Sequence, residues 1–377
     1  MAGVQTVVVT GAGGFLGWHL RCRVHAMRPD LELRLVSRDD LLDERGLAGA
    51  MAGADAVVHL ASAIRGDGLE VANVDLARRL VNAVRASGGS ANVVHANSTH
   101  AESESPYGRS KRRAAEVLSD GMAKSSGQLV DLRFPNLFGE CARPDHNSAV
   151  ATFCRDLAAG RASTVHPEGR TELLHVQDAC ALILDALGRT QSTDRGVPGR
   201  SLPIVDVYSL LARLRAEYAG SVVPILADRL ELQLFNALRT AMFPAHYPIA
   251  LAEHRDERGS FVELARGHQQ TQVSYSTTAP GVTRGEHFHL DKVERFVVLR
   301  GTAEIRVRRL FGDRLHRFAV SGDTPVAVDM PPLHAHDITN IGSDELLTAF
   351  WANDHFNPSA PDTYPERLEP APTGVVR

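Results

Sequence analysis

Tyr107 and Lys111 stand four residues apart, directly after Pro106, in a chain that contains only three lysines. Residues at this spacing share one face of a helix. A lysine ammonium beside a phenol lowers the tyrosine pKa from about 10, and such a tyrosine can exchange a proton with a carbonyl oxygen while a hydride moves at carbon. The hydroxyl of Ser98 or Thr99, at the end of a predicted strand, could bond the same oxygen. These residues predict a redox site for a carbonyl or an alcohol.

A glycine-rich turn lies near the start of the chain, between a predicted strand at residues 4–10 and a predicted helix that ends near residue 27. Glycine there lets the backbone approach a pyrophosphate, and the helix N-terminus supplies N–H donors. The segment is therefore predicted to bind a dinucleotide, although the same glycines could serve only a tight turn. The expected cofactor-binding residues are Gly11, Gly14, Phe15, Leu16 and Gly17.

Ser37 and Arg38 follow the second predicted strand, at the position that selects between dinucleotides. An acidic residue there would hold a ribose 2′-hydroxyl, whereas a neutral residue followed by arginine favours a 2′-phosphate. The sequence therefore favours NADPH, with Asp39 as a moderating acidic neighbour. The alternative is that Arg38 is a solvated surface charge.

A second set of candidate residues lies in the other half of the chain, where the spacing is G-x5-H-x-H-x4-E-x6-G. His287 and His289 are two apart, so that on a strand both imidazoles face one side. With Glu294 and a later His336 they form a donor set suited to a first-row divalent metal, with zinc the expected ion. Glu294 could instead be an exposed charge, His289 a core histidine, or the barrel could hold no metal.

Lys292 and His334 are close to this set in sequence. Both are therefore candidates for proton carriers at the metal site. The alternative for each is a solvated surface position.

Alternating strands and helices must position the redox residues. Strands are predicted over residues 4–10, 31–36, 55–61, 92–96 and 130–134, with helical stretches over 74–86 and 110–124 between the later ones. This alternation predicts an α/β, Rossmann-type, doubly wound parallel sheet.

The pattern of hydrophobic and polar residues along the chain then changes twice. Amphipathic helices are predicted over residues 205–218 and 229–242, and short alternating strands with glycine-bearing turns follow from about residue 256. The second region predicts a C-terminal all-β barrel or sandwich. We therefore expect two domains, a cofactor-binding domain over residues 1–250 and a metal-binding barrel over residues 251–377.

Composition sets the class of protein. Of 377 residues, 44% are hydrophobic and 23% charged, as in ordinary globular proteins, and the net charge of −4 gives no reason to expect nucleic-acid or membrane binding. The four cysteines form no C-x-x-C pair, as expected of buried thiols in a reducing cytoplasm. The expected localisation is cytoplasmic.

The residues of the first half resemble the extended short-chain dehydrogenase/reductase family over about residues 4–190. The resemblance implies a catalytic hydroxyl at Thr99 or Ser98, with Tyr107 as acid/base and Lys111 holding the ribose. It also implies further cofactor-binding and sugar-nucleotide-binding residues, which are Leu60 and Ala61 for the cofactor, and Asn136, Arg143, His146, Asn147 and His175 for the substrate. Members that eliminate water have an acidic pair directly after the strand-end Thr. This chain has His100-Ala101 there, which favours simple reduction.

The metal-ligand spacing of the second half resembles the cupin family, which implies a small jelly-roll barrel with the metal inside. Pro332-Leu333 stands where that family usually has a glycine, a departure that spares His336.

The fusion of the two halves resembles the bifunctional capsular-polysaccharide reductase/epimerases of bacterial UDP-N-acetyl-L-fucosamine synthesis. This resemblance implies C3 epimerisation of a UDP-4-keto-6-deoxy-hexosamine in the cupin, followed by NADPH-dependent reduction of the C4 ketone. It also implies a UDP-sugar substrate and a homodimer. Three alternatives remain: a reductase whose cupin is purely structural, a tailoring enzyme for a dTDP- or UDP-sugar of a secondary-metabolite pathway, and a sugar-nucleotide sensor or scaffold.

Overall fold

The computed structural model describes residues 4–66, 68–219, 223–257, 259–264, 271–354 and 357–368. The chain forms two compact units. The first consists of Met1–Phe138 and Glu168–Pro203, and the second of Gly139–Pro167 and Ile204–Arg377. The division into domains at residue 250 stays a prediction.

The first unit is built on a six-stranded sheet of order β2-β1-β3-β4-β5-β8, in which every pair is parallel. Its strands are β1 (Thr6–Thr10), β2 (Glu32–Val36), β3 (Ala56–His59), β4 (Asn92–Ser98), β5 (Leu129–Phe134) and β8 (Thr193–Gly196). A small second sheet consists of β6 (Asn136–Phe138), β7 (Arg170–His175) and β9 (Arg200–Pro203). The predicted doubly wound parallel sheet is confirmed.

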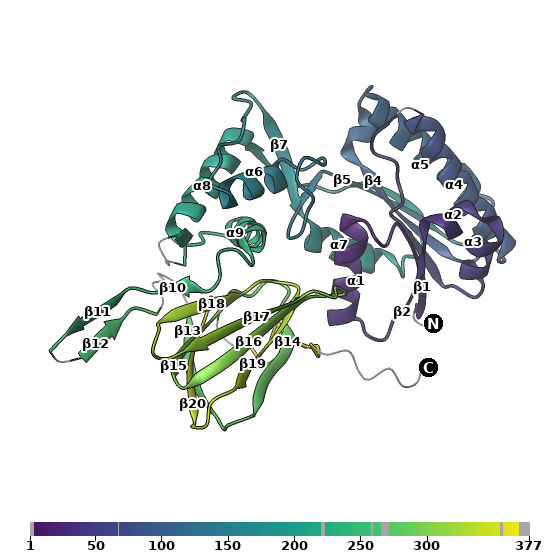
Figure 1. Cartoon of the computed structure of the whole chain (residues 1–377). Helices are drawn as coiled ribbons and strands as arrows, with labels where there is room; N and C mark the ends of the chain where they lie inside the picture. The colour runs from purple at the N-terminus through teal and green to yellow at the C-terminus, as the bar shows by residue number, and fades with distance from the viewer. Residues whose placement is uncertain are drawn as a thin grey trace. The chain divides into compact units, whose positions relative to one another are not determined.

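Helices cover both faces of the six-stranded sheet (Figure 1). They are α1 (Phe15–Met27), α2 (Arg38–Leu42), α3 (Glu44–Met51), α4 (Leu69–Ala86), the 3-10 helix η1 (Thr99–Glu102), α5 (Pro106–Met122) and α7 (Val176–Ala186). Because side chains alternate along a strand, Val7 and Val9 of β1 pack with α1 and α7, whereas Val8 packs on the α4 and α5 side. The inner strands β1, β3, β4 and β5 are thus buried on both faces.

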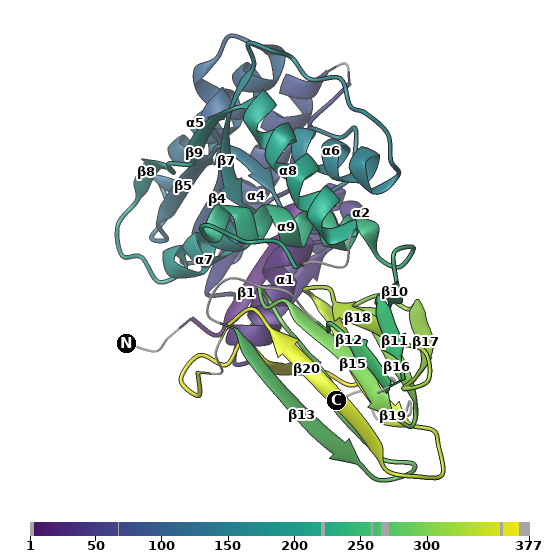
Figure 2. The ribbon, with the colours of Figure 1, turned by 90° about the vertical axis from the view of Figure 1, so that its left-hand side faces the viewer.

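Among its described residues, the second unit has the helices α6, α8 and α9 and two five-stranded antiparallel sheets (Figure 2). The helices are α6 (Ala149–Ala158), α8 (Ile204–Ala219) and α9 (Arg229–Met242). One sheet has the order β10-β18-β15-β20-β13, with β10 (Ile249–Ala250), β13 (Gln272–Thr278), β15 (Glu294–Arg300), β18 (Val326–Met330) and β20 (Leu346–Ala352). The other has the order β17-β16-β19-β14-β21, with β14 (Thr283–Phe288), β16 (Thr302–Arg309), β17 (Leu315–Ser321), β19 (His334–Asn340) and β21 (Tyr364–Pro365).

A separate hairpin pairs β11 (Glu253–Asp256) with β12 (Gly259–Val262). The predicted C-terminal all-β architecture is confirmed. Residues 369–377, the end of the predicted barrel domain, lie outside the described residues.

Polar side chains join the helices of the second unit to its sheets. Arg239 of α9 is fully buried and donates hydrogen bonds to the carbonyl oxygens of Met330 and, at 2.9 Å, of Lys292. Next to it, Arg295 of β15 and Asp329 of β18 form a fully buried ion pair at 2.7 Å. The guanidinium of Arg295 holds the pKa of Asp329 below its usual range, against the opposite effect of burial.

Tyr218 of α8 completes this network. Its hydroxyl donates to the second carboxylate oxygen of Asp329 at 2.7 Å and lies 2.7 Å from the hydroxyl of Tyr247. A buried carboxylate thus connects a helix with two strands of the barrel.

Replacing Asp329 with Ala is expected to destabilise the second unit by about 3–5 kcal/mol, because Arg295 would keep its buried charge without the carboxylate. The two tryptophans, Trp18 and Trp351, lie in different units. Urea unfolding followed by fluorescence in a Trp18→Phe background therefore reports on the second unit alone. The exposed Asp323→Ala variant is the matched control and should stay within about 0.5 kcal/mol of the parent. Equal stability of the two variants would contradict the role of Asp329 as the buried counter-charge of Arg295.

Candidate functional site

The glycine-rich turn lies between β1 and α1 and closes tightly on the end of β3. Gly11 has a φ of +72°, and a Cβ added there would lie 2.7 Å from the backbone nitrogen of Ala61. Gly17 lies against the same turn, where a Cβ would lie 2.7 Å from the Cα of Ala12. Gly14 caps α1 without any side-chain hydrogen bond, which leaves the first N–H groups of the helix for a ligand. The structure therefore brings together Gly11, Gly14, Gly17, Leu60 and Ala61, with Phe15 and Leu16 opening α1.

Ser37 and Arg38 lie at the end of β2, as the sequence predicted. The Ser37 hydroxyl is engaged in a capping box, in which it accepts from the backbone nitrogen of Asp40 at 3.1 Å and donates to its carboxylate at 2.6 Å. Arg38 is the first residue of α2 and is exposed. Of the two residues at this position, Arg38 is therefore the one whose side chain is available to bind a 2′-phosphate.

Tyr107 lies in the first turn of α5, which begins with a Ser105 cap and Pro106. Gly108 allows this turn to approach η1 closely, since a Cβ there would meet the carbonyl oxygen of His100 at 2.3 Å. The approach places Tyr107 beside Ser98, whose side chain shares a hydrogen bond with it. The structure therefore joins Tyr107 and Ser98, while Thr99 opens η1 next to them.

The pKa of Tyr107 departs from the sequence-based expectation. Burial raises it above its ordinary value, and the hydrogen bond with Ser98 only partly offsets that effect. The Lys111 ammonium is buried and donates to the carbonyl oxygen of Ala96 at 2.9 Å. The predicted lowering of the Tyr107 pKa by Lys111 is therefore wrong, because burial of the phenol dominates.

The predicted substrate residues divide between the two units. Asn136 is exposed at the start of β6, and its amide donates to the Thr171 hydroxyl at 3.2 Å. His175 is 1% exposed and packs edge-on against Phe138, with ring centroids 5.2 Å apart, so it contributes to the core of the first unit. The other three belong to the second unit, and they are Arg143, His146 and Asn147.

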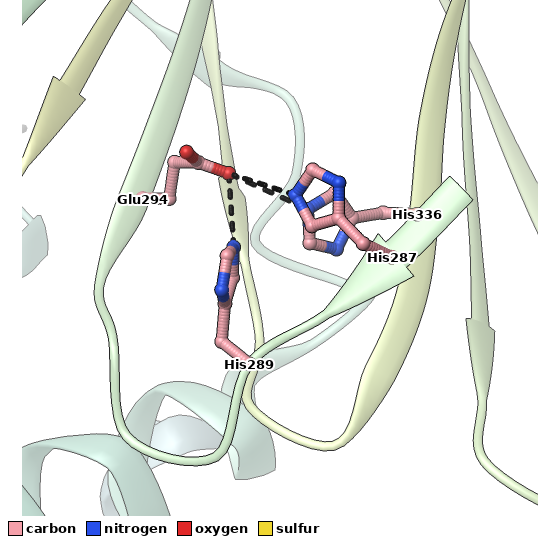
Figure 3. A group of neighbouring side chains, drawn as sticks. All are labelled: His287, His289, Glu294 and His336. Atoms are coloured by element: carbon pink, nitrogen blue, oxygen red, sulfur yellow. Dashed lines mark hydrogen bonds and ion pairs between the residues drawn. The ribbon is translucent and has the colours of Figure 1, made fainter. Parts of the chain in front are cut away.

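The predicted metal ligands converge inside the barrel (Figure 3). Their four ligand atoms lie within 4.8 Å of one another. The carboxylate oxygen Oε2 of Glu294 is 3.1 Å from Nε2 of His289, 3.4 Å from Nε2 of His336 and 3.8 Å from Nε2 of His287. The structure thus brings together all four residues that the sequence predicted.

Strand register explains this convergence. His287 of β14 is directly opposite His336 of β19, and a bulge between Gly285 and His287 shifts the register just before it. Gly285 permits the bulge, because a Cβ there would lie 2.9 Å from the Cα of Asp337. Glu294 is the first residue of β15, on the facing sheet. His289 lies just beyond the end of β14 rather than on a strand.

Neighbouring carbonyls set the tautomers of two of these histidines. Nδ1 of His289 lies 2.5 Å from the carbonyl oxygen of Asp362, and Nδ1 of His336 lies 3.1 Å from that of His334. A carbonyl can only accept, so each Nδ1 carries a proton and each Nε2 directs a lone pair at Glu294.

This donor set fits a divalent cation. The buried Nε2 atoms of His287 and His336 have no hydrogen-bond partner within the described chain. Lone pairs facing a carboxylate repel one another unless a cation or a proton lies between them. Three imidazoles and one carboxylate are also ligands that suit zinc and related metals.

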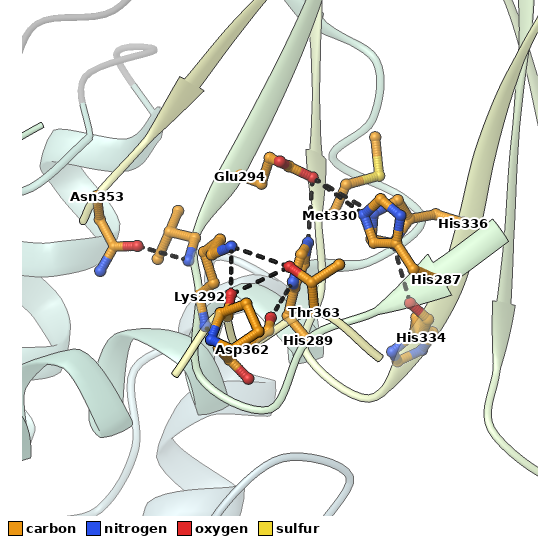
Figure 4. Close-up of polar contacts among 12 residues, drawn as sticks. His287, His289, Lys292, Glu294, Met330, His334, His336, Asn353, Asp362 and Thr363 are labelled. Carbon is orange, nitrogen blue, oxygen red and sulfur yellow. Dashed lines mark hydrogen bonds and ion pairs between the residues drawn. The ribbon is translucent and has the colours of Figure 1, made fainter. Parts of the chain in front are cut away.

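Asp362, which sequence reasoning missed, organises the edge of the site (Figure 4). Its carboxylate accepts from three successive backbone nitrogens, at 2.8 Å from Leu290, 3.0 Å from Asp291 and 2.8 Å from Lys292. No ligand spacing pointed to it, because it comes from a distant segment that reaches the site only in the folded chain.

The two candidate proton carriers lie differently. The Lys292 ammonium donates to the carbonyl oxygen of Pro361 at 3.0 Å and to the hydroxyl of Thr363 at 3.2 Å. It lines a cavity of about 170 Å³ together with His287 and Glu294. His334 is buried, bonded to the carbonyl oxygen of Pro332, and its ring packs against Phe243. Lys292 therefore faces the site, whereas His334 belongs to the core, and neither is a solvated surface group.

Comparison with known proteins gives matches along most of the chain. Residues 7–198 match the NAD dependent epimerase/dehydratase family, and residues 254–364 match the polysaccharide biosynthesis C-terminal domain. A relative from Pseudomonas aeruginosa, UDP-2-acetamido-2,6-beta-L-arabino-hexul-4-ose reductase, is 29% identical over 365 residues, which cover 95% of this chain and 97% of that protein.

Two solved structures support the same reading of the fold. The crystal structure of capsular polysaccharide assembling protein CapF from Staphylococcus aureus matches with a TM-score of 0.61 and 28% identity, over 97% of this chain and 100% of that chain. The structure of RMD from Pseudomonas aeruginosa shares the fold alone, with a TM-score of 0.54 and 20% identity over 63% of this chain and 99% of that chain. These matches confirm the predicted resemblance to a fused reductase/epimerase.

The matched region of the first family covers just over half of the 377 residues and contains the glycine-rich turn, Tyr107 and Lys111. The chain belongs to the NAD dependent epimerase/dehydratase family.

Proposed function

We propose that this protein is a bifunctional sugar-nucleotide enzyme that makes a polysaccharide precursor. The barrel epimerises C3 of a UDP-4-keto-6-deoxy-hexosamine, and the Rossmann-type unit then reduces the C4 ketone with NADPH. The observation that carries the proposal is that one chain combines a Tyr–Lys pair next to a dinucleotide turn with a cluster of three histidines and a glutamate. The names of the relative from Pseudomonas aeruginosa and of the Staphylococcus aureus protein support the substrate class and the pathway type.

The reduction uses groups of the first unit. When bound, NADPH supplies a hydride to C4. Tyr107 gives its proton to the C4 oxygen, and the raised pKa of its phenol keeps that proton available at neutral pH. The hydroxyl of Ser98 or Thr99 bonds the same oxygen, and Lys111 holds the nicotinamide ribose.

The epimerisation relies on the acidity of the C3 proton, which is next to the C4 ketone. A base removes this proton from one face, and a proton returns on the other. His287, His289, Glu294 and His336 would hold a divalent metal, with zinc the expected ion. When bound, such an ion supplies Lewis-acid stabilisation for negative charge on a substrate oxygen.

The proposal also includes the localisation, the oligomeric state and the ligand of the enzyme. We expect a cytoplasmic homodimer that binds a UDP-sugar. All four cysteines are free thiols, as expected in a reducing compartment. Within the described residues, no helix has both the length and the apolar character that a membrane span requires.

Tyr107→Phe should lower kcat for NADPH oxidation with a UDP-4-keto-6-deoxy-N-acetylhexosamine by about 10²–10⁴-fold, because the proton donor is lost. Binding of NADPH, measured by its fluorescence, should change little. The exposed Tyr275→Phe variant is the control. An active Tyr107→Phe enzyme would remove this residue from the mechanism, and wild-type protein that binds NADPH without turning over would argue against the substrate.

Arg38→Asp should reduce kcat/KM for NADPH by about 10–100-fold while improving use of NADH, because the carboxylate repels a 2′-phosphate and can accept from a 2′-hydroxyl. The control is Arg85→Asp, which makes the same charge change at an exposed arginine in the last turn of α4. Unchanged preference in Arg38→Asp would mean that Arg38 is a solvated surface charge.

The double variant His287→Ala/His336→Ala should lose both bound metal and the exchange of the substrate C3 proton with solvent deuterium. Metal content is measured by mass spectrometry and exchange by NMR. His254→Ala, an exposed histidine of the same unit, is the matched control. If exchange persists without metal, the metal has no part in epimerisation. If the wild type binds metal and never exchanges the proton, the barrel is structural.

A further inference from the structure

A row of polar side chains crosses the interior of the six-stranded sheet. Thr10 is paired in register with His59, His59 with His95, and His95 with Asp131, on the neighbouring strands β1, β3, β4 and β5. All four are buried, with exposures of 0%, 2%, 2% and 6%. Their neighbours along these strands are mostly valines and alanines, so the row is an interruption of the hydrophobic core.

Hydrogen bonds connect this row at both ends. The Thr10 hydroxyl lies 2.8 Å from Nδ1 of His59. Nδ1 of His95 lies 2.6 Å from one carboxylate oxygen of Asp131, and the Asn97 amide donates to the other at 2.8 Å. These two contacts, together with the Lys111 charge, leave the pKa of Asp131 below its usual value, although burial alone would raise it. Asp131 is thus a fixed, ionised carboxylate.

Lys111 lies over the same face of the sheet. Val57 and Val93 pack on the α4 and α5 side, and by strand alternation so do His59 and His95, two residues further along. Lys111 is 4% exposed, and its ammonium donates to the carbonyl of Ala96, between His95 and Asn97.

A buried ammonium is costly unless a negative charge lies near it. The titratable groups that act electrostatically on Lys111 come from three strands: His59 on β3, His95 on β4 and Asp131 on β5. Burial lowers the pKa of both histidines, so they are neutral at pH 7. On its own helix, Tyr107 is also neutral at that pH, since its pKa is raised. Asp131 is therefore the negative charge among these groups.

We infer that Asp131, held by His95 and Asn97, is the buried counter-charge of Lys111 and a positioning residue for the redox site. The inference deepens the proposed reduction and rests on it for its catalytic meaning. Asp131 acts through Lys111: it keeps the ammonium protonated, so that the ammonium remains available to a cofactor ribose.

A cavity lies beside this carboxylate. Asp131 and Asn97 line a cavity of about 510 Å³ between α5, β5 and β8, which Asp194 also lines. Asp194 is directly opposite Asp131 on β8, but its side chain is 61% exposed and pairs with Arg133 at 3.2 Å. The two aspartates therefore share a cavity, and only Asp131 is buried against the polar row, which makes Asp194 a matched control.

Two opposing effects determine the pKa of Lys111, and a change in this pKa can be measured. Burial lowers its pKa to about 8, and the charge of Asp131 limits that decrease. Asp131→Asn should shift the pKa down by about one further unit, because a nearby opposite charge is worth one to three units. At pH 8 the protonated fraction would then fall from about a half to about a tenth.

The three lysines of the chain make a direct titration feasible. In protein labelled with ¹³C-lysine, the Cε resonance of Lys111 is assigned with Lys111→Arg and followed against pH in the wild type, Asp131→Asn and Asp194→Asn. We expect the midpoint to decrease by about one unit in Asp131→Asn and to stay unchanged in Asp194→Asn. A midpoint unchanged in Asp131→Asn, or equally shifted in both variants, would overturn the inference.

This titration is done without substrate or cofactor, so it stands or fails separately from the proposed reductase activity. In parallel, NADPH affinity of Asp131→Asn should fall about five-fold at pH 8 and remain close to that of the wild type at pH 6. A uniform loss at both pH values would indicate a merely structural role and count against the inference.

If Asp131→Asn does not fold, the double variant Asp131→Asn/Lys111→Met provides the test. It should fold, because it has no unpaired buried charge. Failure of the double variant would show that the hydrogen bonds of Asp131, rather than its charge, are required, and would overturn the inference.

Discussion

Taking a charge out of water costs several kcal/mol unless an opposite charge or a set of hydrogen bonds compensates for it, and this constraint governs both units of the protein. In the first unit the buried Lys111 ammonium lies on the same sheet face as Asp131. In the second, Arg295 and Asp329 form a fully buried pair that connects helix and barrel. Glu294, facing three imidazoles, is the remaining case. In the proposed metal site the compensating group is a bound cation, and this distinguishes the site from a structural ion pair.

Backbone register determines where these groups meet. Parallel strands place residues of equal depth side by side, so one polar residue on each of β1, β3, β4 and β5 forms a continuous row. In the barrel, antiparallel pairing sets His287 opposite His336, and the bulge next to it adjusts the direction of the strand. In both units, chemistry thus depends on strand pairing that is set by the surrounding hydrophobic residues.

Sequence reasoning predicted what is local. The glycine turn, the helix with Tyr107 and Lys111, and the His–Glu ligand spacing are each encoded within short segments, and the helix over Arg229–Met242 is observed as predicted. Two contributions from distant segments were missed. Asp362 reaches His289 from 73 residues away, and Asp131 reaches His95 from 36 residues away. The direction of the Tyr107 pKa shift was wrong for the same reason, since burial depends on the packing of η1 against α5 and not on the Tyr–Lys spacing.

The proposed chemistry imposes an order on the two reactions. The C3 proton is acidic only while C4 is a ketone, so reduction at C4 ends any further epimerisation at C3. A reductase that accepted the substrate before epimerisation would produce an alcohol that the barrel could no longer correct. Selectivity for the epimerised ketone must therefore be a property of the reductase, through a difference in transition-state binding between two C3 epimers. Tyr107 and its hydroxyl neighbour act at C4 and would meet the same oxygen in either epimer. The discrimination must accordingly come from residues that contact the sugar around C3, and hydrogen bonds to the C3 hydroxyl are the contacts with enough energy to provide it.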